Sequence, residues 1–434
     1  MTLKDKIKIE FYKLSERILP VYSKRKYIVK EILLKRNFKA IPNIFTSESA
    51  KPKKYISNIV RTEGKKTILI IDHKIPEYDK DAGSNTILGY IKIMAESGLN
   101  ILFISDDRKI TEPYCKALKD IGVNVFYGPF NFKRWIKKNG GKIDYVLLSR
   151  PYTALRHIDN IGRFSGAKLY YYTHDLHFLR ELRKFNISRN KKDYNNFKKF
   201  KAIEYYIFEK SDIVLTPSVQ EKEYLDEDFK NIVVFPPYYY DSFLDKNRIS
   251  GSFKKRTDIM FLGNFDHKPN VDAVLWFSEK IFPVIKEKIP SIKLYVIGAN
   301  PTDAVIKLSE NEDIAVTGYV NDLTEYFEKA RVFIAPLRYG AGIKGKIITA
   351  LYYGIPVVST SVGMEGIGLI NFENILIADE PESFADYVSL AYSDEKLWSS
   401  LSYNSMNFVE NNYNKDILKN EFEKLFKINE KMNG

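Results

Sequence analysis

The sequence is poor in cysteine and histidine. Its 434 residues include one cysteine, Cys115, and five histidines. A single thiol excludes a disulfide framework and a cysteine-based metal site within this chain. The histidines form no obvious ligand cluster, so we expect no metal and no other cofactor. The low cysteine content also fits a cytoplasmic location.

Long apolar runs are missing as well. No stretch approaches the roughly 18 residues that a membrane-spanning helix requires. The charged N-terminus has no uninterrupted apolar segment of the kind found in a secretory signal. We therefore expect any membrane contact to be peripheral, on the inner face of the membrane.

Charge is abundant, with an excess of basic residues. Lys and Arg number 68 against 55 Asp and Glu, a formal net charge of +13. This excess favours nucleic acid, anionic lipid or phosphorylated substrates without choosing among them. Hydrophobic residues make up 44% of the chain. The length predicts two α/β domains of roughly 150–200 residues each.

Short apolar strand patterns alternate with helical patterns over most of the chain. This alternation predicts two Rossmann-like domains with mostly parallel sheets, which face each other across a cleft. Strands are expected at 67–72, 101–105, 123–127, 145–148, 168–173, 213–216 and 232–235, and then at 259–262, 293–297, 315–317, 332–335 and 356–359. The polar segment Tyr238–Arg256 would link the two series.

The chain is thereby divided into four parts. We expect a basic amphipathic helical extension at 1–60, a first domain at 61–240, a second domain at 241–410, and a C-terminal helix at 411–434 that crosses back to the first domain. Apolar residues of the extension, such as Ile7 and Phe11, repeat at helical spacing. The extension is interpreted as a helical pair packed on the body or as a membrane-surface anchor.

Candidate residues of the first domain follow its strands, because parallel sheets bind ligands beyond the carboxyl ends of their strands. Gly83 lies in a loop that ends at a helix start, where a ligand phosphate can approach the backbone. A plain turn explains this loop equally well. His174 and Asp175 follow the strand at 168–173. A histidine there can move a proton or donate to a substrate hydroxyl, unless local contacts merely satisfy it.

The second domain offers more basic candidates. Gly263 lies in the turn after its first strand, and Lys268 at the next helix start could supply a cation to a diphosphate or could be an ordinary exposed lysine. A glycine-rich loop leads into a helix near residue 346. Cations surround this loop, which favours phosphate binding over a solvated basic loop. The loop and its surroundings contribute Arg338, Gly340, Gly342, Lys344, Gly345 and Lys346.

These segments resemble the family 4 retaining glycosyltransferases of the GT-B fold, also called group 1. GAGIKGK followed by GIPVVSTSVGMEG is very similar to the donor-site signature of that family. FLGNFDHKPNVDAV with IKLYVIGANP resembles the start of its donor domain. IPEYDKDAGSN and THDLHFLRELR resemble its first-domain loops. The resemblance runs from about Thr67 to the C-terminus and leaves out residues 1–60.

The resemblance implies roles for particular residues. His174 would face the reacting sugar, and we assign it with Asp175 to the catalytic centre. Gly83 would lie near the donor phosphate, and Lys268 would neutralise the diphosphate. Glu365 would lie near the sugar or the ribose. The full expected donor-binding set is Gly83, Gly263, Lys268, Arg338, Gly342, Lys344, Lys346, Thr349 and Glu365.

Two positions depart from the family pattern. The family usually has an arginine where Asn264 stands, so one phosphate cation is missing. It usually has a glutamate that accepts from the ribose hydroxyls where Thr349 stands. Threonine can form a hydrogen bond there but supplies no charge.

The sequence thus predicts a glycosyltransferase that moves a sugar from a nucleotide-sugar donor to a glycan or lipid-linked acceptor with retention, in cell-surface polysaccharide synthesis. Lysine and arginine would stabilise the leaving diphosphate without a metal. Basic and aromatic residues alternate in Leu179–Tyr206, which favours an anionic membrane surface as a partner.

Three alternatives remain open. A nucleotide-sugar epimerase would need acid and base carboxylates in the cleft, which we cannot assign. A non-catalytic glycan-binding or scaffold subunit of a polysaccharide assembly complex is favoured by Asn264 and Thr349. Nucleic-acid binding is allowed by the charge, but no recognised module accompanies that charge, so we expect none.

Overall fold

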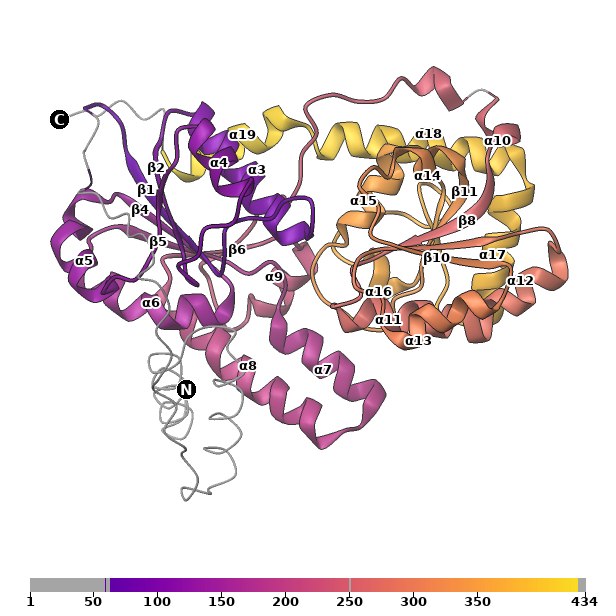
Figure 1. Cartoon of the computed structure of the whole chain (residues 1–434), viewed down its shortest axis with the longest axis horizontal. Helices are drawn as coiled ribbons and strands as arrows, with labels where there is room; N and C mark the ends of the chain where they lie inside the picture. The colour runs from indigo at the N-terminus through magenta and orange to yellow at the C-terminus, as the bar shows by residue number, and fades with distance from the viewer. Residues whose placement is uncertain (1–58, 60–62, 250, 428–434) are drawn as a thin grey trace.

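The computed structural model describes residues 59, 63–249 and 251–427, which form two α/β domains arranged side by side (Figure 1). The expected extension at 1–60 therefore lies almost entirely outside the described residues. Each domain is built on one sheet, and neighbouring strands are parallel throughout both. The predicted fold class is confirmed.

The first sheet has the strand order β3-β2-β1-β4-β5-β6-β7. Its central strand β1 has the sequence TILIID and is buried along its whole length. Helices cover both faces of a parallel sheet, which is why this strand is continuously apolar rather than alternating. The strands are β1 (Thr67–Asp72), β2 (Asn100–Ser105), β3 (Asn124–Phe126), β4 (Tyr145–Ser149), β5 (Lys168–Tyr172), β6 (Ile213–Thr216) and β7 (Ile232–Val234).

The helices of the first domain connect these strands. Two of them, α7 and α8, pack against each other as a hairpin that projects from the body of the domain (Figure 1). The helices are α3 (Ala82–Glu96), α4 (Tyr114–Asp120), α5 (Phe132–Asn139), α6 (Pro151–Phe164), α7 (His177–Ser188), α8 (Lys191–Lys210) and α9 (Val219–Leu225).

The second sheet has the order β10-β9-β8-β11-β12-β13. Its strands are β8 (Thr257–Leu262), β9 (Leu294–Ile297), β10 (Ile314–Gly318), β11 (Ala330–Ala335), β12 (Val357–Ser359) and β13 (Leu376–Ile377). Its helices are α10 (Ser252–Lys255), α11 (Lys268–Trp276), α12 (Phe282–Lys288), α13 (Asp303–Ile306), α14 (Thr324–Lys329), α15 (Gly345–Tyr352), α16 (Ser361–Met364), α17 (Pro381–Ser393) and α18 (Glu395–Asn412).

The last helix, α19 (Lys415–Leu425), packs on the first domain. Leu418 and Phe422 are buried in the core that contains β1 and α3. The Tyr145 hydroxyl of β4 donates a 2.6 Å hydrogen bond to the Phe426 carbonyl. The chain therefore crosses between the domains twice, and the two crossings are joined where the Tyr240 amide donates to the Tyr413 carbonyl.

In both sheets the strand order reverses at the corresponding position. In each, the chain adds strands on one side of the first strand and then returns to the other side, between β1 and β4 and between β8 and β11. Ligands bind at such switch points, beyond the carboxyl ends of the strands. No helix within the described residues is long and apolar enough to cross a membrane.

Candidate active site

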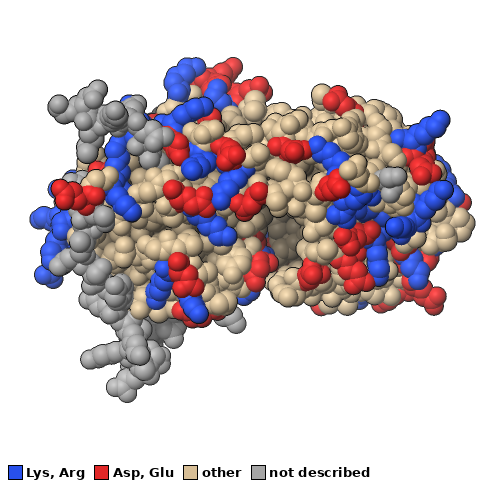
Figure 2. All heavy atoms as spheres, turned by 90° about the horizontal axis from the view of Figure 1, so that it is seen from above, with Lys and Arg blue, Asp and Glu red and all other residues tan. Residues whose placement is uncertain are grey.

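A cleft of about 1010 Å³ lies between the two domains and is lined by loops at the carboxyl ends of both sheets. Figure 2 shows the hollow between the two halves of the molecule. The first domain contributes the loops after β1, β4 and β5, and the second contributes those after β8, β9 and β11. The two switch points therefore face the same space.

His174 lies on the first-domain side of this cleft, just beyond β5. Its Nε2 is 2.6 Å from the Ser149 hydroxyl, and its ring meets the edge of Tyr172 at 4.6 Å between centroids. Burial, with the nearby Arg150 charge, holds the pKa of His174 well below its ordinary value. The imidazole is therefore neutral at pH 7 and fixed in orientation, so it can donate to or accept from a sugar hydroxyl.

The Asp175 carboxylate has two basic partners on its own side of the cleft. Its Oδ1 is 2.9 Å from His177 Nδ1, and its Oδ2 pairs with Arg180. Burial would raise the pKa of Asp175, but Arg180 and His177 hold it below its usual range. Across the cleft, a Cβ added at Gly342 would lie 2.8 Å from the Asp175 Cβ. Asp175 therefore orders the loop beside His174 and packs on the glycine-rich loop.

Gly83 lies in the first turn of α3, against His174. The N-cap residue Asp81 accepts from the Ser84 amide at 2.8 Å and so fixes this turn. A Cβ at Gly83 would lie 2.4 Å from Arg150 Nη2 and 3.1 Å from His174 Nδ1. Glycine is needed here because both side chains approach the helix start.

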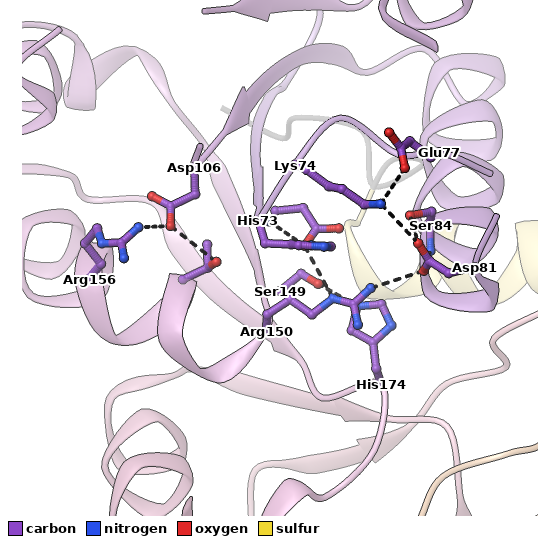
Figure 3. Close-up of polar contacts among 12 residues, drawn as sticks. His73, Lys74, Glu77, Asp81, Ser84, Asp106, Ser149, Arg150, Arg156 and His174 are labelled. Carbon is purple, nitrogen blue, oxygen red and sulfur yellow. Dashed lines mark hydrogen bonds and ion pairs between the residues drawn. The ribbon is translucent and has the colours of Figure 1, made fainter. Parts of the chain in front are cut away.

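Arg150 is a cleft residue that the sequence analysis missed. It follows β4 directly, and its guanidinium lies 3.6 Å from Asp72 Oδ1 and 3.6 Å from Asp81 Oδ1. Figure 3 shows it beside the His174 ring. In the sequence, Arg150 could be noticed as a basic residue between the end of a buried strand and Pro151. Its neighbours in sequence do not indicate which side chains it contacts.

The second domain places two lysines at the start of α15, of which Lys344 is buried and Lys346 is half-buried. Lys344 Nζ donates to the Gly342 carbonyl at 2.7 Å, and Lys346 Nζ donates to Asn270 Oδ1 at 2.7 Å. Burial lowers the pKa of Lys344 to about 8 and the pKa of Lys346 to about 7. Neither ammonium forms an ion pair within the part of the chain that the structure describes. A buried cation without a carboxylate partner is costly, so this wall favours an anionic ligand.

The structure does not bring two of the expected cations to the cleft. Lys268 is exposed on the first turn of α11, whereas Asn270 of the same turn faces inward and takes Lys346. Arg338 is held away by an ion pair with Asp272. Lys268 and Arg338 are both absent from the cleft lining. Lys268 lies on the solvent-facing side of α11, and the ion pair with Asp272 keeps Arg338 out of the cleft. Both positions differ from the expected donor-binding set.

The other expected donor-binding residues lie at or near the cleft. Gly263 and Thr349 line it. Gly342 packs beside it, against His174 and Asp175. The Thr349 hydroxyl donates to the Gly345 carbonyl at 3.0 Å. Glu365 does not line the cleft but forms an interdomain contact.

Two contacts from the first domain hold the glycine-rich loop. Arg183 of α7 donates to the Gly340 carbonyl at 2.8 Å and pairs with Glu365 at 2.6 Å. Glu221 of α9 accepts from the Gly342 amide at 2.7 Å, and it also accepts from the Leu176 amide beside Asp175. Burial, with the Asp175 charge, raises the pKa of Glu221 to about 7. Sequence reasoning assigned no role to Arg183 or Glu221 in joining the domains.

No group of three or more His, Cys, Asp or Glu side chains is placed to hold a metal ion among the described residues. The expectation that the site uses no metal and no other cofactor stays a prediction.

Sequence comparison finds a family model that matches most of the second domain. The model of the family "Glycosyl transferases group 1" matches residues 256–394. An uncharacterized 44.6 kDa protein in the cps region of Klebsiella pneumoniae is 27% identical over 207 residues, 46% of this chain and 50% of that protein. The capsular polysaccharide biosynthesis glycosyltransferase CapM of Staphylococcus aureus is 23% identical over 191 residues, 42% and 50% respectively. The matches span about half the length of these curated relatives.

Solved structures are similar over most of the chain. Sucrose-phosphate synthase from Thermosynechococcus elongatus has a TM-score of 0.64 at 16% identity, covering 84% of this chain and 98% of that one. Anabaena HepE in complex with UDP-glucose has a TM-score of 0.62 at 11% identity, covering 83% and 99%. Residues 256–394 therefore match the group 1 glycosyltransferases, within a chain that has the GT-B fold.

Proposed function

We propose that this chain is a retaining glycosyltransferase of cell-surface polysaccharide synthesis, which moves a sugar from a nucleotide-sugar donor to a glycan or lipid-linked acceptor. One observation carries the proposal. A neutral His174 from the first domain, and the buried Lys344 and half-buried Lys346 from the second, face the same cleft. The match to group 1 glycosyltransferases and to a capsular polysaccharide enzyme supports it.

The donor diphosphate would lie at the start of α15. Helix N-termini favour anions because their first amides and the helix dipole point toward the ligand. Lys344 and Lys346 add charge to that position, and charge-assisted contacts are the strongest hydrogen bonds that proteins make to phosphate. They would stabilise the charge that develops as the diphosphate leaves, without a metal ion. HepE, a structural neighbour, has been solved with UDP-glucose, which makes UDP-sugars the first donors to test.

The sugar would lie between His174 and the glycine-rich loop. His174 would hold a sugar hydroxyl through the ring nitrogen that Ser149 does not occupy. Arg183 and Glu221 would keep Gly340 and Gly342 close to this position. Retention rests on the resemblance of GAGIKGK and GIPVVSTSVGMEG to retaining enzymes, and product anomeric configuration measured by NMR tests it.

A nucleotide-sugar panel tests the function directly. The protein is incubated with UDP-, GDP-, ADP- and dTDP-sugars, and nucleoside diphosphate release is followed with and without glycan acceptors. We expect slow release from one donor, which the His174→Ala variant abolishes. Absence of both binding and release for every donor would contradict the proposal. Tight binding without release would instead favour the non-catalytic subunit to which Asn264 and Thr349 point.

The acceptor is proposed to be held at an anionic membrane surface. Lys191 and Lys192 are exposed near the tip of the α7–α8 hairpin, whereas Arg183 and Lys184 of α7 are held in ion pairs with Glu365 and Asp193. Each basic residue close to an anionic leaflet contributes about 1 kcal/mol.

Vesicle flotation tests this part of the proposal. We expect recovery with anionic vesicles that falls with salt and falls roughly tenfold in the Lys191→Gln/Lys192→Gln variant. The Lys254→Gln/Lys255→Gln variant removes the same charge from exposed positions of α10 and should behave as the unmodified protein. Equal recovery with neutral and anionic vesicles contradicts a membrane-held acceptor.

A further inference from the structure

Two residues at the switch point of the first sheet have an unusual backbone conformation. Arg150 follows β4 with a φ of 69°, and His174 follows β5 with a φ of 59°. Residues other than glycine adopt such values at a cost in free energy, and they persist where the surrounding structure fixes them. Strands β4 and β5 are neighbours, so the two strained positions lie side by side in the cleft. Strain of this kind gathers at functional sites.

The Arg150 side chain is oriented toward the start of α3. Its Nη2 packs against Gly83, and Asp72 and Asp81 lie on either side of the guanidinium. Figure 3 shows the ion pair with Asp81 and the adjacent His174 ring. The guanidinium is therefore placed between the proposed sugar contact and a helix N-terminus, on the wall that faces Lys344 and Lys346.

The opposite loop, after β8, supplies no cation to this region. Asn264 forms hydrogen bonds within its own loop: its side chain accepts from the Asp266 amide, and its backbone carbonyl accepts from the Asn270 side chain. Lys268 points to solvent. His267 lines the cleft, but partial desolvation and the nearby Arg180 charge lower its pKa, so it is neutral at pH 7. Among the described residues of this loop, none offers a cation to the cleft.

We propose that Arg150 binds the distal phosphate of the leaving nucleoside diphosphate, and so supplies from the first domain the cation that the Asn264 loop lacks. This inference rests on the proposed function. In the transfer, the bond from the anomeric carbon to the phosphate oxygen breaks with its electron pair going to that oxygen. The acceptor oxygen bonds to the anomeric carbon, and its proton passes to the departing phosphate. Arg150 stabilises the negative charge on that phosphate.

Titration calorimetry with matched nucleotides tests the inference. UDP and UMP are used, or the corresponding pair for the base that the unmodified protein binds. UMP lacks the distal phosphate. We expect Arg150→Gln to weaken UDP binding roughly ten- to a hundred-fold and to leave UMP binding unchanged, and Arg150→Lys to recover part of the loss. Arg163→Gln removes the same charge from the exposed end of α6 and should bind both ligands normally.

A second variant separates binding from folding. Arg150→Gly accepts a positive φ without strain but leaves Asp72 and Asp81 without the guanidinium, so its melting temperature measures that structural cost separately, while UDP affinity should fall as in Arg150→Gln. Normal UDP binding in both variants overturns the inference, as does an equal loss for UDP and UMP. A change confined to the acceptor KM also overturns it. If the unmodified protein binds no nucleoside diphosphate, the proposed function itself fails.

Discussion

The two walls of the cleft differ in whether their basic side chains have carboxylate partners. On the first-domain wall each arginine has a carboxylate neighbour, as Arg150 has Asp72 and Arg180 has Asp175. On the second-domain wall, the buried Lys344 and the half-buried Lys346 have no ion-pair partner among the described residues. Ion pairs fix the orientation of the first-domain side chains, whereas lysine ammonium groups without a carboxylate partner favour the binding of an anionic ligand. His174 of the first wall should therefore govern turnover, whereas the lysines of the second wall, together with the proposed phosphate contact of Arg150, should govern donor affinity.

Removing His174 should give the largest effect and confine it to turnover. We expect His174→Ala to lower kcat by roughly 10²- to 10⁴-fold, because the variant loses the group that contacts the reacting sugar. Donor affinity should change less than about threefold, since His174 contacts the sugar, whereas the proposed phosphate contacts come from Lys344, Lys346 and Arg150. Initial rates and calorimetry measure the two quantities. Unchanged turnover would give the histidine a structural role and remove the distinction between the walls.

Removing a lysine of the second wall should give the reverse result. Lys346→Ala and Lys344→Ala should each weaken nucleoside diphosphate binding by roughly ten- to a hundred-fold, because each loses a charge-assisted contact. The corresponding nucleoside should bind almost unchanged. Lys268→Ala is the matched control, and its exposed position predicts normal affinity. A loss in Lys268→Ala as large as in Lys346→Ala would return Lys268 to the site.

The second wall should also respond to pH. Burial lowers the pKa of Lys346 to about 7, so part of the population is neutral at physiological pH. A bound diphosphate raises that pKa, which means that binding takes up protons and weakens as pH rises above 7. We expect roughly a tenfold loss of affinity between pH 6.5 and 8.5. Calorimetry in buffers of different ionisation enthalpy should show the uptake, and Lys346→Arg should reduce it.

The contact between the walls predicts the smallest effect, on stability. The pKa of Glu221 is raised from 4.5 to about 7, so the folded state holds a proton that the unfolded chain has lost between these values. The stabilisation is complete below pH 4.5 and is lost as pH rises toward 7. Glu221→Gln should flatten this dependence by on the order of 1 kcal/mol. Urea unfolding from pH 4.5 to 8 measures it. An unchanged slope would place the pH dependence elsewhere.

The glycine-rich loop shows what the sequence can determine alone. Its glycines and lysines lie within ten consecutive residues, between a buried strand and a helix, so local spacing already predicted that Lys344 and Lys346 begin a helix near a ligand. Strand β1 was expected at 67–72 and occupies Thr67–Asp72. Here too the local pattern was enough, because a continuous apolar run between helical patterns is typical of a buried parallel strand. The two-residue β13 gave no such pattern and was not expected.

Tertiary structure decided which side chains meet. Lys268 and Asn270 lie two residues apart, but the phase of α11 sends the lysine to solvent and the asparagine to Lys346, a difference that spacing alone does not resolve. Arg150 acquires its neighbours from other strands and helices, and Glu221 reaches Gly342 from more than a hundred residues away. Sequence patterns encode burial and local turns, because these depend on nearby residues. The pairing of distant charges depends on how the two domains pack, and it is fixed only when the cleft forms.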